Sequence, residues 1–496
     1  MTMVDGIFCE KKAHTLTRMI RADALRKKEC PALDLTGRAK RCNIGGMKVV
    51  IVGIGMTGSA LALRLLNEKH DVTVVDEDFD TVEDIVTRSD VKGVVGSCLD
   101  RNILADAEVQ KADCFFACTL RDELNILSAV LAKKMGAKHT VARVRDPKYF
   151  TSLEGLKDEL GVDMMFNPEY RTAMEIAQIL KFPSAISADT FASGKMTLTE
   201  LRIAADSPIA GLTVMDAARK ADGKLLFAVV ARGDKVFIPG GDFVLQAGDL
   251  VHVAAEEKEL LEFTKQIKLF KQRAKNVFIV GGGRISYYLA KELLDKGVQV
   301  KILEIDEERC HELDEELTHA TVICADGTDT AVLDEEGIRE ADAFVALTAL
   351  DEENAVIALY AASFGDKKVI TKVLAQPLGK MVKKLGLDTV ISPHEVISDL
   401  LVRFVRAHQV EDGAGINALY RIHDRAEAIE FTVDRDFKGL NIPLKSLKLK
   451  HNVLLCGLVR DGVFILPSGD TSLQEHDKVL VVTGVKQVTE LNQIVK

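Results

Sequence analysis

The stretch from Val49 to Asp76 constrains the fold more than any other part of the sequence. Two apolar runs, Val49–Val52 and Val72–Val75, predict buried strands. The segment between them has the apolar period of a helix, carried by Leu61, Leu65 and Leu66. Three glycines before this helix have the spacing G-x-G-x-x-G: Gly53, Gly55 and Gly58. Asp76 ends the second run, 18 residues after the last glycine. This order of elements predicts a dinucleotide-binding βαβ unit.

Each of these residues has a separate physical task in such a unit. Gly53 allows a tight turn, and Gly55 lets the backbone approach a pyrophosphate, which the N–H groups and the dipole of a helix N-terminus favour. Gly58 lets the helix pack closely on the strand. Asp76 can accept hydrogen bonds from both hydroxyls of an adenosine ribose. The alternative is a βαβ unit whose glycines serve packing alone.

The same stretch occurs a second time. Residues 277–304 repeat it at an offset of 228 positions. Gly281, Gly283 and Ser286 now occupy the glycine positions, and Glu304 occupies that of the acid. Because serine is small, we expect helix and strand to pack there a little further apart. The segments ADCFFACTLRDELN and ADAFVALTALDEEN also match, at an offset of 229. The chain is therefore a tandem duplication.

We predict an α/β protein with two Rossmann-like, doubly wound parallel sheets in tandem, each followed by a small α+β module. For 496 residues, two to four domains are expected. The predicted order is an N-terminal extension (1–46), a first nucleotide-binding domain (47–167), a connecting helix (168–182), a first β-rich module (183–270), a second nucleotide-binding domain (271–393), a connecting helix with a linker (394–420) and a second β-rich module (421–496). The amphipathic helix 168–182 could cross over to a partner subunit.

Further elements are expected in the first half. Apolar runs and alternating segments predict strands over Gly93–Gly96, Cys114–Cys118, His139–Val144, Thr197–Ile203, Leu225–Arg232, Lys235–Ile238 and Leu250–Ala255. Helices are expected over Asp122–Lys134 and Val214–Arg219. The apolar residues of the first of these helices are Leu124, Leu127, Val130 and Leu131.

Ligands bind such a sheet at the carboxyl ends of its strands. Thr119 and Arg143 lie there in the first half, and Lys372 replaces the arginine in the second. They are candidates to meet phosphate or the second nucleotide. The alternatives are a helix cap for Thr119 and a surface cation for Arg143. A further loop carries Ser97 in the first copy and Asp326 in the second, so we expect the two sites to differ in affinity.

Composition narrows the classes of function. The net charge of −10 argues against a dedicated nucleic-acid-binding protein, because those usually present a basic face. No apolar run approaches the ~18–20 residues that span a bilayer. The nine cysteines are scattered without a disulfide spacing, which favours a reducing cytoplasm.

No pattern of catalytic or metal-binding residues stands out. Cys310, His311 and Glu312 are adjacent on an acidic helix, which is typical of a solvated face. The first β-rich module offers no triad, no metal-ligand spacing and no paired carboxylates. His252 and His394 are single histidines, and we expect structural roles for them. We therefore predict no catalytic residues and no metal site.

Residues 1–46 stand apart. They contain ten Lys or Arg against five Asp or Glu, and they lack the apolar core of a secretory signal. They have no counterpart in the second copy, and Met47 directly precedes the first strand. We expect a poorly ordered extension or an artefact of the choice of start site. A basic arm that contacts anionic lipid is the functional alternative.

These segments resemble the RCK (or KTN) domains of the TrkA family, the cytoplasmic regulatory subunits of bacterial and archaeal K⁺ transporters. The resemblance is carried by VVIVGIGMTG with Asp76, ADCFFACTLRDELN and VARVRDP, and by VFIVGGGRIS with Glu304, ICADGTD and ADAFVALTALDEEN. Glycine turns are common to many Rossmann proteins. Their combination with DE-x-N after the fourth strand, a β-rich module and duplication is much more specific. The resemblance covers nearly all of 47–496 and leaves out 1–46.

The resemblance implies which residues bind a nucleotide. In the first half these are Gly53, Ile54, Gly55, Met56, Thr57, Gly58, Asp76, Cys118, Thr119 and Arg143. In the second half they are Gly281, Gly282, Gly283, Arg284, Ile285, Glu304, Asp326, Gly327 and Thr348. The family's acidic loop on the adenine side is present at Asp326 and lost at Ser97, which leaves the adenine contacts of the first site open.

The resemblance also implies a function. The sites should bind NAD or NADH, with ATP or ADP as an alternative at one of them. The chain would lie on the inner face of the membrane as a dimer or tetramer, and its rearrangement would gate a separate membrane-spanning K⁺ transporter subunit without enzymatic chemistry. An NAD-dependent oxidoreductase is the enzyme alternative. A nucleotide-sensing transcription factor is a third reading, which the acidic balance and the lack of a recognisable DNA-binding module disfavour.

Overall fold

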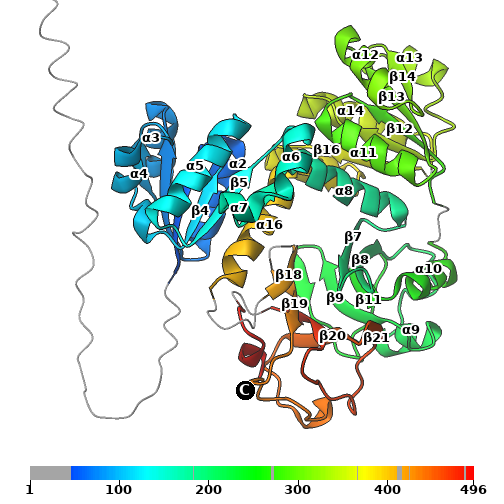
Figure 1. Cartoon of the computed structure of the whole chain (residues 1–496). Coiled ribbons are helices and arrows are strands. Elements are labelled where there is room, and N and C mark those ends of the chain that lie inside the picture. Colours follow the sequence, from blue (N-terminus) through cyan, green and yellow to red (C-terminus); the bar gives the residue numbers. More distant parts are fainter. Residues whose placement is uncertain are drawn as a thin grey trace, which may run out of the picture. The chain divides into compact units, whose positions relative to one another are not determined.

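The computed structural model describes residues 46–182, 184–269, 273–365, 367–409, 416–423, 425–484 and 488–496. The extension predicted over 1–46 lies outside these residues except for Gly46, and so does part of the linker predicted within 394–420. Figure 1 shows the helices and strands along the chain.

The first α/β domain, residues 46–167, is built on a six-stranded parallel sheet. Its order, β3-β2-β1-β4-β5-β6, switches direction between β1 and β4, as in doubly wound folds. Its strands are β1 (Lys48–Val52), β2 (Asp71–Asp76), β3 (Lys92–Val95), β4 (Cys114–Ala117), β5 (His139–Arg143) and β6 (Met164–Phe166). Its helices are α2 (Met56–Asn67), α3 (Phe79–Arg88), α4 (Arg101–Asp106), α5 (Asp122–Met135), α6 (Pro147–Glu154) and α7 (Lys157–Leu160). The five strands predicted here are confirmed, and β6 is additional.

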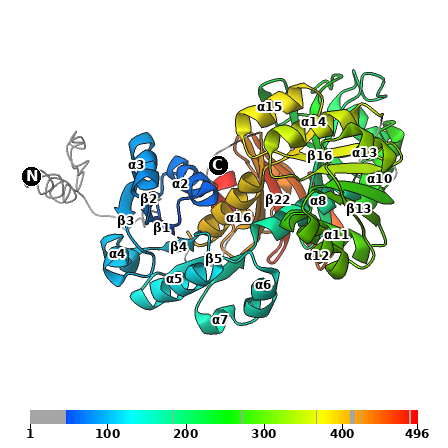
Figure 2. The ribbon, with the colours of Figure 1, turned by 90° about the horizontal axis from the view of Figure 1, so that it is seen from above.

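Alternation along β1 explains why helices cover both faces of this sheet. Val49 and Ile51 share one apolar core with Leu61 of α2. Val50 and Val52 belong to the opposite core, which includes residues of α4 and α5. Figure 2 shows α2 and α3 on one side of the sheet and α4 and α5 on the other. A strand buried on both faces is apolar throughout, so it reads as a continuous apolar run.

The second α/β domain, residues 273–392, repeats this sheet in the order β14-β13-β12-β15-β16-β17. Its strands are β12 (Asn276–Val280), β13 (Gln299–Glu304), β14 (Thr321–Cys324), β15 (Ala343–Ala346), β16 (Lys368–Lys372) and β17 (Thr389–Ile391). Its helices are α11 (Arg284–Asp295), α12 (Glu307–Glu316), α13 (Thr330–Glu335), α14 (Asp351–Ala362) and α15 (Gln376–Lys384). The predicted pair of doubly wound parallel sheets is confirmed.

Each α/β domain is followed by a five-stranded antiparallel sheet. The first β module (184–269) contains β7 (Ser187–Phe191), β8 (Met196–Arg202), α9 (Val214–Lys220), β9 (Leu226–Arg232), β10 (Lys235–Phe237), β11 (Leu250–Ala255) and α10 (Glu257–Gln266). The second β module (416–496) contains β18 (Ile416–Ile422), β19 (Ala426–Thr432), β20 (Val453–Arg460), β21 (Val463–Ile465) and β22 (Lys478–Thr483). The predicted strands of the first module are confirmed. Its β7 was not predicted, because SADTF does not alternate polar and apolar residues.

The two β modules share one apolar core. Leu198 and Val229 of the first module lie in it with Ala428, Leu480 and Val482 of the second. All five side chains are almost completely buried. The two antiparallel sheets therefore bury these faces against each other.

A buried aspartate holds an arginine in both β modules. Asp249 is 1% exposed and accepts bonds from Nε and Nη2 of Arg232, both at 2.7 Å. Asp477 is equally buried and accepts the same pair from Arg460 at 2.8 and 2.7 Å. This two-point geometry explains why arginine recurs at both positions, since lysine has no planar fork.

The connecting helices cross between the halves. The helix α8 (Pro168–Lys181) follows the first α/β domain but packs against α11 of the second (Figure 1). The helix α16 (Pro393–Ala407) follows the second α/β domain but packs against α2 of the first (Figure 2). Ile176 of α8 lies in one core with Leu289 of α11, and Leu401 of α16 lies in one with Leu61 of α2. The helix expected to reach a partner subunit therefore meets the other half of its own chain.

One buried arginine joins three of these parts. Arg406 of α16 is 2% exposed. It donates to Glu68, at the end of α2, from Nε and Nη2 at 2.8 Å, and to Glu427 of β19 from Nη1 and Nη2 at 2.8 and 2.9 Å. Arg421 of β18 also binds Glu68. Burial opposes the charge of Arg406, but its two carboxylates outweigh this effect and raise its pKa.

The expected apolar side of α5 is partly wrong. Leu127 is 55% exposed. The helix instead buries Asn125, Ser128, Ala129 and Ala132. Short side chains let α5 lie close to β4 and β5, and they leave the larger leucine on the outer side.

Arg406→Ala should lower the free energy of unfolding by about 3–5 kcal/mol, because it leaves Glu68 and Glu427 buried without their shared cation. Chemical denaturation followed by circular dichroism measures this loss. The matched control is Arg435→Ala: Arg435 pairs with Glu475, but its side chain is 82% exposed, so the change should stay below about 1 kcal/mol. Equal losses in the two variants would contradict the role assigned to Arg406.

Glu175 of α8 should make stability depend on pH. Burial, followed by the charge of Asp399 on α16, raises the pKa of Glu175 from 4.5 to about 7. The folded state therefore binds this proton more tightly than the unfolded chain, and stability falls as the pH rises from about 4.5 through about 7. Glu175→Gln should stabilise the protein more at about pH 8 than at about pH 5, by on the order of 2 kcal/mol. Thermal unfolding at both pH values checks this. Glu83→Gln, on the exposed side of α3, is the control. A gain in stability of Glu175→Gln that does not depend on pH would contradict the prediction.

Candidate functional site

The first glycine turn joins β1 to α2 where the sheet switches direction. Gly53 has a φ of +85°, in the left-handed region, and a Cβ on it would lie 2.5 Å from the backbone N of Thr119. A Cβ on Gly58 would lie 2.0 Å from the carbonyl O of Gly53. Both glycines are therefore required by close approaches within the protein itself.

Gly55 has a different task. It is exposed, its φ is −65°, and a Cβ on it would meet no described atom within 4 Å. It is the N-cap of α2, and no side chain caps the helix there. The backbone at Gly55 thus presents the N-terminus of a 12-residue helix to open space, a position that favours an anion.

Asp76 lies at the end of β2 beside this turn. Its carboxylate accepts hydrogen bonds from the backbone N–H groups of Ile54 at 2.6 Å and Asp78 at 3.0 Å. Because each carboxylate oxygen can accept more than one hydrogen bond, Asp76 fixes the turn and retains capacity for ribose hydroxyls.

Cys118 and Thr119 form the opposite rim, after β4. Cys118 is buried, and burial raises the pKa of its thiol to about 12. Asn125 accepts from the N–H and the hydroxyl of Thr119 at 2.7 and 2.8 Å, and it donates to the carbonyls of Thr119 and Arg143 at 3.1 and 3.0 Å. The N-cap of α5 is Arg121, so Thr119 does not cap that helix. The asparagine of DE-x-N thus ties the ends of β4 and β5 together, a role that sequence reasoning missed.

Arg143 is not a surface cation, and that alternative is wrong. It is 7% exposed, and its Nη2 donates to the carbonyl of Thr119. Its Nε has no hydrogen-bond partner in the described part of the chain. Burial lowers the pKa of Arg143, so a nearby anion would stabilise its charged form. His394, at the start of α16, is half-buried; burial, and after it the charge of Arg143, lowers its pKa.

The second glycine turn joins β12 to α11 with the same geometry. Gly281 has a φ of +96°, and a Cβ on Gly283 would meet nothing described within 4 Å. Ser286 is fully buried, and its hydroxyl donates to the carbonyl O of Gly281. The third position therefore accommodates its side chain through a hydrogen bond.

Glu304 stands beside the second turn as Asp76 does beside the first. Its carboxylate accepts from the N–H of Gly282, and from those of Ile305 at 2.8 Å and Asp306 at 2.9 Å. Arg309 of α12 donates from Nε to the carbonyl of Gly282 at 2.8 Å. The backbone of this turn is thus held from both directions.

The outer loops of the two sites differ in charge. Asp326 accepts from the N–H and the hydroxyl of Thr328 at 2.8 and 2.7 Å, and these bonds lower its pKa. Gly327 has no room for a side chain, because a Cβ would lie 2.2 Å from Val280. The hydroxyl of Ser97 in the first loop accepts a long bond, from the N–H of Leu99 at 3.5 Å. The second loop therefore carries an exposed negative charge that the first lacks at this position.

The other predicted residues lie at the same turns and rims. The N–H of Thr348 donates to Asn354 at 2.7 Å, as Thr119 does to Asn125. At the turns, Ile54 and Thr57 are buried, Ile285 is half-buried, and Met56 and Arg284 are exposed. The fold thus brings each predicted set to one edge of its sheet. Their binding of a nucleotide stays a prediction.

The predicted solvated face of α12 is correct for His311 and Glu312, which are exposed. It is wrong for Cys310, which is 8% exposed and lies with Sγ 3.4 Å from the carbonyl O of Glu304. Of these three adjacent side chains, one is therefore buried and two are exposed.

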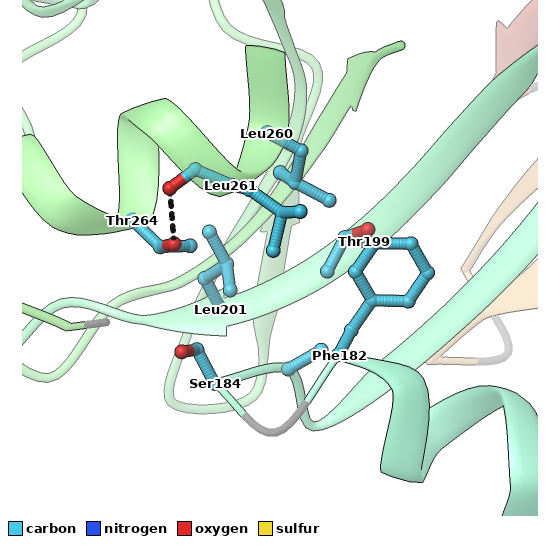
Figure 3. Close-up of a pocket in the computed structure, with 8 residues that line it drawn as sticks. Phe182, Ser184, Thr199, Leu201, Leu260, Leu261 and Thr264 are labelled. Carbon is cyan, nitrogen blue, oxygen red and sulfur yellow. Dashed lines mark hydrogen bonds between the residues drawn. The ribbon is translucent and has the colours of Figure 1, made fainter. Parts of the chain in front are cut away.

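A pocket with mostly apolar walls lies between the end of α8 and the first β module. Figure 3 shows the residues that line it: Phe182, Ser184, Ala185, Thr199, Leu201, Leu260, Leu261 and Thr264. The hydroxyl of Thr264 donates to the carbonyl of Leu261 at 2.9 Å. None of the described residues that line the pocket is charged, and none is a predicted nucleotide-binding residue.

Sequence reasoning missed a polar cluster between the β modules. Glu200, His252 and His423 each place one possible ligand atom within 4.8 Å of the others. Burial, with His423 adding to it, lowers the pKa of His252 to about 4, against the effect of Glu200. Burial disfavours the Glu200 carboxylate, but the two histidines outweigh it and lower its pKa to about 2. His252 is therefore not an isolated histidine, because it lies in a cluster with Glu200 and His423. No local spacing could show this cluster, because Glu200 and His423 are 223 residues apart.

Among the described helices, none combines the length and the apolar character needed to cross a membrane.

Models of two domain families match both halves of the chain. The TrkA-N domain matches residues 49–168 and 277–393, and the TrkA-C domain matches residues 198–268 and 428–496. The chain belongs to the TrkA family. A TrkA relative, the Trk system potassium uptake protein TrkA homolog of Archaeoglobus fulgidus, is 32% identical over 448 residues, which are 90% of this chain and 100% of that protein. TrkA homolog 1 of Methanosarcina mazei is 33% identical over 463 residues, 91% of this chain and 100% of that protein.

Solved structures share the fold of this TrkA-family chain. The GsuK channel bound to NAD matches with a TM-score of 0.60 at 17% identity, over 95% of this chain and 80% of that one. The GsuK RCK domain matches with a TM-score of 0.58 at 18% identity, over 92% and 95% of the two chains. The predicted RCK architecture is therefore confirmed.

Gly58→Val should lower the free energy of unfolding by about 1–3 kcal/mol, because its side chain has no room beside the carbonyl of Gly53. Gly55→Val should change it by less than about 1 kcal/mol, because the position is open and its φ suits any residue. Urea denaturation compares the two variants, with Gly283→Val expected to behave like Gly55→Val. Equal destabilisation by all three would contradict the separate tasks assigned to these glycines.

Proposed function

We propose that this chain is a nucleotide-sensing regulatory subunit of a Trk-type potassium uptake system. Its two glycine turns and their acids would bind the pyrophosphate and adenosine of NAD or NADH, with ATP or ADP as the alternative at one site. Membership of the TrkA family supports this proposal. So does the fold, which is shared with a channel whose solved structure has NAD bound.

The observation that carries the proposal is an open middle glycine beside an acid, at both switch points. Gly55 and Gly283 each precede a helix and face open space. Asp76 and Glu304 hold the two turns from the side. A pyrophosphate suits the open helix N-terminus, and a ribose suits the carboxylate. A turn that served packing alone would not need this open space.

The charges at the two sites support different affinities. The first site has Arg143 at its rim, and the second has Lys372, whose pKa burial lowers against the effect of Asp351. Arginine offers phosphate a planar fork, whereas lysine is a point charge. Asp326 adds a negative charge to the second site. The same nucleotide should therefore bind the two sites unequally.

A rigid element leads from the first site to the other half of the chain. The helix α2 begins after Gly55 and ends before Glu68, which holds Arg406 and Arg421. Its 12 residues span about 18 Å. A nucleotide that moves the start of α2 would therefore act on this ion network. Only a nucleotide that binds two arrangements of the protein unequally can shift the balance between them.

The proposed partner is a separate, membrane-spanning Trk-type K⁺ transporter subunit. Regulation of such a partner requires the chain to lie on the inner face of the cell membrane. We propose that it acts there as a homo-oligomer, a dimer or tetramer. Sensing by differential binding consumes no nucleotide, so we propose no enzymatic activity. Because the net charge is −10, we also propose no binding of nucleic acid.

Calorimetric titration of the full chain with NADH, NAD, ATP and ADP tests the proposal. Asp76→Ala should remove binding at the first site and Glu304→Ala at the second, so each variant should lose one bound nucleotide per chain. Asp80→Ala removes an exposed carboxylate near the first site and should bind as the wild type does.

Because Asp76 and Glu304 also hold backbone N–H groups, thermal unfolding of each variant must accompany its titration. Loss of binding in a variant that still unfolds cooperatively supports the assignment. The proposal fails if the wild type binds no nucleotide, or if both variants bind as it does. Oxidation of NADH with a panel of carbonyl substrates would instead favour the oxidoreductase alternative.

A further inference from the structure

Three polar side chains meet where the β modules pack together. Glu200 on β8 lies opposite His252 on β11, in the first module. His423 lies in the turn between β18 and β19, in the second. One ligand atom from each is within 4.8 Å of the others, and Nε2 of His423 is 2.8 Å from Oε1 of Glu200. Leu198 and Ala254, two residues from Glu200 and His252, belong to the apolar core that the modules share.

The protein does not satisfy His252 by itself. Its side chain is 1% exposed, and Nδ1 makes no hydrogen bond with any part of the chain that the structure describes. Glu200, its cross-strand neighbour, is 7% exposed. Buried polar atoms in folded proteins are normally paired, so the unpaired imidazole nitrogen of His252 indicates a missing partner.

We propose that Glu200, His252 and His423 bind a divalent transition-metal ion of the Zn²⁺ type, which joins the two β modules. Imidazole nitrogen and carboxylate oxygen together suit Zn²⁺ and its neighbours in the first transition row, whereas Ca²⁺ and Mg²⁺ prefer oxygen ligands alone.

The distances suit such an ion after a small adjustment. Tetrahedral Zn²⁺ with bonds of about 2.0–2.1 Å places its ligand atoms about 3.4 Å apart. The cluster, now within 4.8 Å, would close by at most about 1.5 Å through side-chain rotation. The side chain of His423 is 37% exposed, so solvent reaches the cluster and a water molecule can fill the fourth position.

One hydroxyl group contacts the carboxylate from behind, and a second contacts the first. Ser187 of β7 donates to Oε2 of Glu200 at 3.4 Å, and its hydroxyl lies 3.0 Å from that of Tyr420 on β18. Oε1 of Glu200 is the oxygen that faces His423. The carboxylate therefore has an outer hydroxyl partner, as metal-binding carboxylates usually have.

The duplication provides an internal comparison for the strands. Glu430 on β19 lies opposite Leu480 on β22, as Glu200 lies opposite His252. The buried glutamate is thus present in both modules. The histidine is present only in the first, and a leucine takes its place in the second.

The turns that these glutamates reach differ in the same way. Glu430 accepts from the backbone N–H of Ala192, in the turn after β7 of the first module, at 2.7 Å. Glu200 instead meets the imidazole of His423. Ala192 and His423 occupy equivalent places, and both have a φ of +49°. At equivalent positions, Glu200 therefore has two histidines beside it, whereas Glu430 has a leucine and a backbone N–H group.

An ion at this cluster would stabilise the contact between the β modules. Two of its ligands belong to the first module and one to the second, so binding requires the modules to be packed together. The stabilisation would grow with the concentration of free metal. None of these residues belongs to the nucleotide turns, so this inference does not depend on the proposed function.

Calorimetric titration of the chelator-treated full chain with Zn²⁺ tests the site. The wild type should bind one ion per chain, and its unfolding temperature should rise with added Zn²⁺. His252→Leu, which copies the residue of the second module, should abolish both effects. Ser187→Ala should weaken binding about 10–100-fold, the usual effect of losing an outer partner. Co²⁺ should give the visible absorption of a tetrahedral site in the wild type and not in His252→Leu.

His476→Ala is the matched control, because it removes a histidine whose side chain is 82% exposed. His423→Ala changes a solvent-accessible turn, so it keeps the test decisive if His252→Leu does not fold. The inference is overturned if the wild type binds no Zn²⁺ stoichiometrically, if both ligand variants bind as it does, or if His476→Ala loses binding equally. Tighter binding of Ca²⁺ or Mg²⁺ would overturn the assigned metal class. Nucleotide titrations of His423→Ala should match the wild type.

Discussion

The position of α16 depends on the buried charge of Arg406. Its guanidinium is enclosed by Glu68 from the first α/β domain and Glu427 from the second β module, so three parts of the chain must converge before it is neutralised. Because removal of any partner leaves a buried charge, we infer that this network specifies one arrangement of α2, α16 and β19. Apolar packing alone is less selective, since aliphatic cores accept many repackings of similar volume.

The two halves change their contacts without changing the backbone frame. At the third glycine position, Gly58 closes against a carbonyl by having no side chain, whereas Ser286 donates a hydrogen bond to the equivalent carbonyl. In the β modules, Glu200 and Glu430 keep the same place but have different partners across the shared core. Both buried glutamates keep a hydrogen-bond partner, as buried polar groups normally do. The repeat therefore constrains shape more than chemistry.

The sequence predicted what local periodicity determines. Most strands and both glycine turns follow from patterns within a few tens of residues, whereas β6 and β7 do not. The predicted nucleotide residues accordingly lie together at the sheet edges. The side of α5 was misjudged at Leu127, because apolar spacing cannot show that the small residues lie nearest the sheet. The burial of Arg143 and the clamp made by Asn125 depend on tertiary neighbours. Arg406 and Glu68 are 338 residues apart, a separation that no local pattern encodes.

The exchange of α8 and α16 explains what the fusion of two halves achieves. Each helix leaves its own half and completes the core of the other. Between two separate copies of one half, the same exchange would be a domain swap, which needs two molecules to meet. Within one chain, the connecting segments hold the two halves near each other, so the exchange no longer requires two molecules to meet. In a pair of identical copies, every substitution appears in both halves. In the fused chain, a substitution changes one half alone. Two halves with one backbone can thus bear different ligand sites.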